Sequence, residues 1–142
     1  MKTNIILTKI WSDDFSAEFN IKFMTTLNYE NFVVSGNYFA TKENLKDLAN
    51  LLNKTSGSVV FGSKKSNDYC ELTVSQSERG YKNINYRLVK NGESDEFIDK
   101  IDMSLNTGYI IEPAIIDRIV PKLDEFYDES DGSQISLVNT EN

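Results

Sequence analysis

The chain has 142 residues, enough for one ordinary domain, and no stretch approaches the roughly 20 apolar residues that span a bilayer. It contains no histidine, which excludes Ser-His and Cys-His nucleophilic catalysis and nearly all zinc and non-haem iron sites. An enzyme of this composition would depend on carboxylate, lysine or tyrosine chemistry. The sequence indicates no cofactor and no metal.

The formal net charge of −7 is concentrated in one part of the chain. Residues 1–92 hold 12 Lys/Arg and 9 Asp/Glu, whereas residues 93–131 hold 3 Lys/Arg and 12 Asp/Glu. Because phosphate binding requires a basic footprint, this acidic block argues against nucleic acid as a partner. It is compatible with a basic protein partner.

Three strands are predicted in the first 40 residues. Residues 15–27 alternate between apolar and polar side chains, the pattern of a long strand with one solvent-facing side. Residues 4–10 and 31–39 are predicted strands on either side of it, and the three form a meander. The N-terminal apolar run turns polar at Thr8 and Lys9, too early for a signal-peptide core, so we expect a cytoplasmic protein.

Two amphipathic helices are predicted further along the chain. The first covers residues 42–53, because Thr41 is a good N-cap and leucines follow at helical spacing. The second covers residues 113–127 and contains Pro121 on its polar side, where we expect a kink facing water instead of a break. Further strands are predicted at residues 58–62, 69–75, 83–90 and 97–105.

These elements predict an α+β fold, an antiparallel, curved sheet of about seven strands with two amphipathic helices. Residues 1–127 form a single domain, and residues 128–142 form a polar, acidic C-terminal tail. The tail is expected to fray, although residues 135–138 could pair as a short edge strand. The apolar faces of the elements predict one core that includes Phe19, Ile21, Phe23, Leu45, Leu48, Leu72, Leu88, Ile119 and Leu123.

The only cysteine, Cys70, alternates with Leu72 and Val74, which places it on the inner face of a strand. A reactive thiolate needs a nearby cation or histidine. We therefore interpret Cys70 as a core thiol and not as a nucleophile.

Two acidic segments could carry chemistry. Asp95, Glu96, Asp99 and Asp102 could supply the paired carboxylates of a glycosidase-like site, although a bulge or a late strand start explains Asp99 more simply. Residues 128–132 faintly resemble a calcium loop. Aligning Gly132 with the invariant loop glycine puts Tyr127 at the first ligand position, so no calcium site is predicted.

The last helix carries Asp117, Asp124 and Asp128 on one stripe, with Glu125 adjoining. The stripe is either an ordinary solvated face or a patch that docks a basic partner, with Tyr29, Tyr81 and Tyr109 as aromatic anchors if they are exposed. The predicted partner-binding residues are Asp95, Glu96, Asp102, Asp117, Asp124, Glu125 and Asp128.

The order of elements resembles the WapI-like immunity proteins of bacterial polymorphic toxin systems. The resemblance covers most of residues 3–127. It is carried by a strand with alternating phenylalanines, a capped helix from Thr41 to Leu52, the run Ser56-Gly57-Ser58-Val59-Val60-Phe61, the strand Tyr69 to Ser75, the turn Gly80-Tyr81 into Ile84-Asn85-Tyr86-Arg87-Leu88, and a closing amphipathic helix. Relatives often have Gly-His at that turn, and no family site transfers residue by residue. The resemblance implies a non-enzymatic inhibitor that binds a toxin domain made in the same cell. Two alternatives stay open, a small-ligand-binding module with a pocket between helix and sheet, and a carboxylate-based hydrolase.

Overall fold

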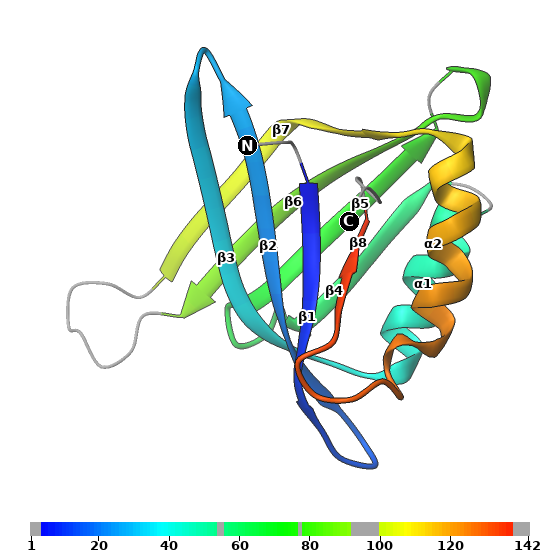
Figure 1. Ribbon diagram of the computed structural model, residues 1–142. Coiled ribbons are helices and arrows are strands. Elements are labelled where there is room, and N and C mark those ends of the chain that lie inside the picture. Colours follow the sequence, from blue (N-terminus) through cyan, green and yellow to red (C-terminus); the bar gives the residue numbers. More distant parts are fainter. Residues whose placement is uncertain (1–3, 54–55, 77, 92–99, 138–142) are drawn as a thin grey trace.

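A computed structural model describes residues 4–53, 56–76, 78–91 and 100–137, which form two antiparallel four-stranded sheets and two helices (Figure 1). One sheet has the order β3-β2-β1-β8 and is built from β1 (Asn4–Ser12), β2 (Ala17–Leu27), β3 (Glu30–Ala40) and β8 (Gln134–Ser136). The other has the order β4-β5-β6-β7 and is built from β4 (Gly57–Ser63), β5 (Asp68–Gln76), β6 (Lys82–Asn91) and β7 (Lys100–Ile111). The α+β class and the antiparallel pairing are confirmed, and the strands of the described residues, eight in number, are divided between two sheets instead of forming one.

The alternating pattern at the start of the chain produces the predicted meander. β2 pairs with β1 on one side and with β3 on the other. Phe19, Ile21 and Phe23 are each at most 2% exposed, whereas the polar side chains between them face outward. The β2–β3 connection is a two-residue turn in which Asn28 and Tyr29 both have left-handed φ values, 52° and 66°, the conformation of a type I′ hairpin.

The two helices lie side by side along one flank of the sheets, at the right of Figure 1. α1 (Lys42–Asn53) begins after Thr41, whose side-chain oxygen accepts the Asn44 amide at 3.2 Å, while the Asn44 side chain accepts the Thr41 amide at 2.8 Å. α2 (Pro113–Phe126) begins at its proline and continues through Pro121, which is exposed. Both predicted helices are confirmed, and Pro121 does not break the second.

One core joins both sheets and both helices, and it contains all nine residues predicted for it. The Phe23 ring stacks on that of Tyr86 from the other sheet, with centroids 3.6 Å apart, and the Phe19 ring stacks on that of Phe126 from α2 at 5.7 Å. Cys70 is fully buried, and burial raises the pKa of its thiol, which keeps it protonated at neutral pH. The core-thiol interpretation is consistent with this environment.

The segment after α2 returns to the first sheet. β8 pairs with β1, with Ile135 opposite Leu7, and the side chains of Ile135 and Leu137 are buried in the core. The edge strand predicted at residues 135–138 is present at residues 134–136, and residues 138–142 lie outside the described residues. In the described part of the chain, no helix is long and apolar enough to cross a membrane.

Candidate partner-binding surface

The acidic stripe predicted on the last helix lies on the solvent side of α2. Asp117, Asp124 and Glu125 are exposed, while the apolar residues of the same helix face the core. None of these three carboxylates forms an ion pair with another described residue. Their negative charge is therefore available to a partner.

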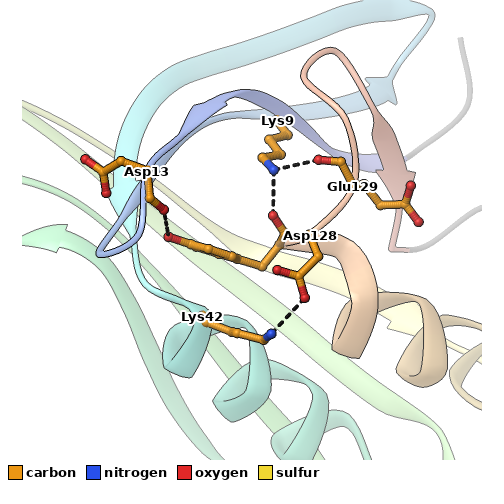
Figure 2. Close-up of polar contacts among 6 residues, drawn as sticks. Lys9, Asp13, Lys42, Asp128 and Glu129 are labelled. Carbon is orange, nitrogen blue, oxygen red and sulfur yellow. Dashed lines mark hydrogen bonds and ion pairs between the residues drawn. The ribbon is translucent and has the colours of Figure 1, made fainter.

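Asp128 differs from the rest of the stripe because it is paired. It follows the end of α2, and its Oδ2 accepts a hydrogen bond from Lys42 Nζ, at the start of α1, at 2.7 Å (Figure 2). This bond holds the pKa of the Asp128 carboxyl below its ordinary value of 3.8. Asp128 thus links the two helices, which the helical pattern alone did not predict.

Replacing Lys42 with Met is expected to raise the pKa of Asp128 towards its ordinary value, as measured by NMR titration of the side-chain carboxyl. The contribution of this pair to stability is present at neutral pH and lost as the pH falls through the lowered pKa. Asp13 serves as the internal control. Its pKa is lowered by the Ser16 and Phe15 amides and should not move. An unchanged Asp128 titration in Lys42→Met would show that the ion pair does not persist in solution.

A buried lysine fixes the chain that follows α2. Lys9 is 3% exposed, and its Nζ donates to the carbonyl oxygens of Tyr127 and Glu129, each at 2.6 Å (Figure 2). Its backbone also accepts from the Gly132 amide at 2.6 Å and donates to the Ser133 carbonyl at 2.9 Å. A cation beside the C-terminal carbonyls of a helix is favourable in charge as well as in hydrogen bonding. Lys9 therefore determines where the acidic residues after α2 lie.

The β1–β2 turn contacts the segment that follows α2. The hydroxyl of Tyr127 donates to the Asp13 carbonyl oxygen at 3.3 Å, and the Asp13 side chain accepts the Phe15 and Ser16 amides at 2.7 and 2.9 Å. Burial of Tyr127 and the negative charges of Asp13, Asp128 and Asp14 raise the pKa of its hydroxyl. Two acidic segments more than 100 residues apart in sequence are thus neighbours.

We call this surface the acidic end of the molecule. The acidic end consists of seven exposed acidic residues: Asp13, Asp14, Asp124, Glu125, Asp128, Glu129 and Asp131. The charge pattern of the sequence did not predict the first two, because residues 1–92 are positive as a whole. In the sequence these two residues belong to the turn Ser12-Asp13-Asp14, and such a turn is typical of any solvent-exposed connection, so it did not indicate a binding surface.

Large apolar side chains are exposed beside the acidic end. The side chains of Trp11, Phe15 and Phe39 are 37%, 85% and 51% exposed, and the Trp11 and Phe39 rings meet edge to face with centroids 5.9 Å apart. Exposed aromatic residues near charged ones are the usual anchors of protein interfaces.

The tyrosines predicted as anchors lie elsewhere. Tyr29 is fully exposed, but it lies in the β2–β3 turn, at the other end of β2 from the acidic end. Tyr81 is partly buried, and the side chain of Tyr109 lies outside the described part of the structure. Tyr29 therefore lies away from Asp13 and Asp128, because a strand of 11 residues separates the two turns.

The other predicted site residues do not join this surface in the described part of the chain. Asp117 lies more than two helical turns before Asp128, and it lines a hollow of about 200 Å³ with Lys82 and Pro113. Asp102 belongs to β7, opposite Val89, and nothing further is described of its side chain. Asp95, Glu96 and Asp99 lie outside the described residues, as does the start of the strand predicted at residues 97–105.

Two larger hollows bear on the alternatives raised by the sequence. One, of about 360 Å³, lies between the end of β3, the start of α1 and the β4–β5 turn, and is lined by Phe39, Thr41, Asn44 and Asp68 among others. The second, of about 420 Å³, lies between α2 and β8 and is lined by Lys122, Glu125, Glu129 and Gln134 among others.

The described residues contain no cluster of Cys, Asp and Glu suited to hold a metal ion. The carboxylates and exposed rings at the acidic end can provide charge attraction and aromatic contacts to a partner.

Compared with models of known protein families, with curated proteins and with solved structures, the chain has no match.

Proposed function

We propose that this protein is a non-enzymatic binding protein that recognises a basic protein through its acidic end, and that it acts as an immunity protein against a toxin domain made in the same cell. The observation that carries the proposal is the convergence of two distant acidic segments beside exposed aromatic rings. The toxin as partner rests on the resemblance of the element order to WapI-like immunity proteins. The absence of histidine and the protonated thiol of Cys70 fit a role without catalysis.

The electrostatics support binding over simple solvation. Like charges gathered on one surface repel one another, which lowers the stability of the folded protein, and solubility requires only a mixed charged surface. Lys9 is held by backbone carbonyls and Lys42 by Asp128, so these two cations do not neutralise Asp124 and Glu125. The negative electrostatic potential of these carboxylates accelerates association with a basic protein surface and disfavours association with an acidic one.

A charge-reversal experiment tests the proposal. Asp124→Lys combined with Glu125→Lys is expected to slow association with the basic partner at least tenfold and to weaken its salt dependence, because both carboxylates face solvent without ion-pair partners. The partner tested is the C-terminal domain of the large secreted protein expected in the neighbouring gene. Association rates at low and high salt and the survival of cells that produce the toxin are measured. Thermal stability should be nearly unchanged.

A matched control separates the local surface from the net charge. Glu30→Lys combined with Glu78→Lys changes the net charge by the same amount at two exposed positions away from the acidic end, and it should bind almost as wild type. If the two double variants protect cells equally, the acidic end is only a solvated surface. If the neighbouring gene encodes no toxin, the immunity role is wrong even where binding to another basic protein is found.

The hollow beside α1 favours a second candidate, a small-ligand-binding module. It lies between a helix and a sheet and combines the Phe39 ring with the polar side chains of Thr41, Asn44 and Asp68. Thermal shift measurements against a metabolite library, with Asn44→Ala as the variant, would distinguish this function from protein binding. For a carboxylate-based hydrolase, Glu125 and Glu129 are a described pair of acids that line one hollow, beside β8, while Asp95, Glu96 and Asp99 lie outside the described residues.

A further inference from the structure

β3 has one edge with which no described strand pairs. It is the terminal strand of its sheet, and its only described strand partner is β2. The two-residue turn pairs Leu27 with Glu30, so the even-numbered residues of β3 bond to β2 and the odd-numbered residues direct their N–H and C=O groups outward. The bond from Lys90 Nζ to the Asn37 carbonyl oxygen, at 2.5 Å, agrees with this direction.

The C-terminal part of this edge is covered, whereas no described strand or helix covers residues 31–35. Lys90 is held over the end of β3 by Asp68 at 2.8 Å, and this end of the strand packs against β4 and β5. The outward backbone groups of Asn31, Val33 and Ser35 make no backbone hydrogen bond with any described residue. We call residues 31–35 the open edge.

β3 itself lacks the residues and the bulge that usually prevent an edge strand from pairing with other molecules. β3 contains no lysine, arginine or proline, and its register with β2 is continuous from Ala40 to Glu30 without a bulge. Phe32 and Val33 are 47% and 50% exposed. Native proteins protect such edges or use them for pairing.

We propose that two copies of this chain associate through their open edges as an antiparallel β3–β3 pair with its two-fold axis at Val33. In this register Val33 lies opposite the partner subunit's Val33, and Asn31 lies opposite the partner subunit's Ser35. Each of these pairs exchanges two backbone hydrogen bonds, because their N–H and C=O groups point outward. Phe32 then lies opposite the partner subunit's Val34, and pairing buries apolar surface of both side chains that is exposed to water in the single chain.

The order of side chains along the open edge fits a second copy, because antiparallel self-pairing about Val33 places polar Asn31 opposite polar Ser35 and apolar Phe32 opposite apolar Val34. The protein carries a net charge of −7, so two copies repel across most orientations, but the open edge contains no charged side chain. In the proposed register the acidic ends lie on opposite sides of the two-fold axis, each about 23 Å from it along the strand. The pairing is closed by symmetry and does not propagate, and its short length predicts a reversible dimer.

Cysteine trapping tests the register. Val33→Cys is expected to form a covalent dimer in a glutathione redox buffer, because the two Cα atoms of a directly opposed pair lie about 5.5 Å apart, within disulfide range. Ser35→Cys is the matched control and should remain monomeric, since the two copies of residue 35 lie about 13 Å apart. The native Cys70 is buried, so we expect it to take no part in the crosslink. Equal crosslinking of both variants, or of neither, would overturn the proposal.

Sedimentation equilibrium provides a measurement without an introduced thiol. The average mass of the wild type should rise from 16.2 kDa towards twice that value with increasing concentration, and that of Val33→Pro should not. Proline at position 33 removes an outward N–H and no bond to β2, and circular dichroism checks that the fold is retained. Association of Val33→Pro equal to that of the wild type, a wild type that stays monomeric, or masses beyond a dimer would each contradict the closed pair.

Discussion

Replacing Phe23 with Ala is expected to lower the free energy of unfolding by about 3–5 kcal/mol, the cost of removing a fully buried ring and leaving a cavity. The Phe23 side chain is 1% exposed and stacks on the Tyr86 ring, so it joins one sheet to the other. A loss of this size is a large fraction of the 5–15 kcal/mol that stabilises an ordinary domain. Urea denaturation should show a lower midpoint with an unchanged slope.

Phe15→Ala is the matched control, because it removes the same ring from a position that is 85% exposed. Its urea midpoint should lie close to that of the wild type. Similar midpoints for the two variants would mean that the contact between the sheets does not form as described.

Replacing Lys9 with Met is expected to have the second largest effect, a loss of about 2–4 kcal/mol in the free energy of unfolding. The substitution leaves the carbonyl oxygens of Tyr127 and Glu129 without their donor. The bond to Tyr127 is buried and that to Glu129 is partly buried, and an unsatisfied buried acceptor costs about 1–3 kcal/mol. The loss of stability should appear first as local opening of the chain that follows α2, before the whole protein unfolds. The Leu137 amide, which donates to the Ile5 carbonyl in the described structure, should exchange its hydrogen faster.

Lys42→Met provides the comparison. It also removes a lysine that contacts the chain end, but Lys42 and Asp128 are exposed and their attraction is screened by water. Its effect on the midpoint should be much smaller. If both variants lose the same stability, the buried position of Lys9 has no special role, and the chain after α2 is held by the pairing of β8 alone.

The sequence alone was sufficient for features that depend on neighbours along the chain. The alternation around Phe19 and Phe23 predicted β2 and its buried face, and the leucine spacing after Thr41 predicted α1 with its bounds. Both follow from the repeat of a single element, because the face that a residue occupies is determined by the 2-residue or 3.6-residue period. The buried position of Cys70 followed from the same rule.

The tertiary structure decided which segments meet. The division of the strands into two sheets and the pairing of β8 with β1 join residues far apart in sequence, and no local period contains this information. The same reason applies to the candidate site. Asp13 and Asp14 looked like an ordinary turn in a positive part of the chain, and Asp128 looked like a free member of a helical stripe. Only the contacts made by Lys9, Tyr127 and Lys42 place those acids together, because charges converge in space through folding and not through order along the sequence.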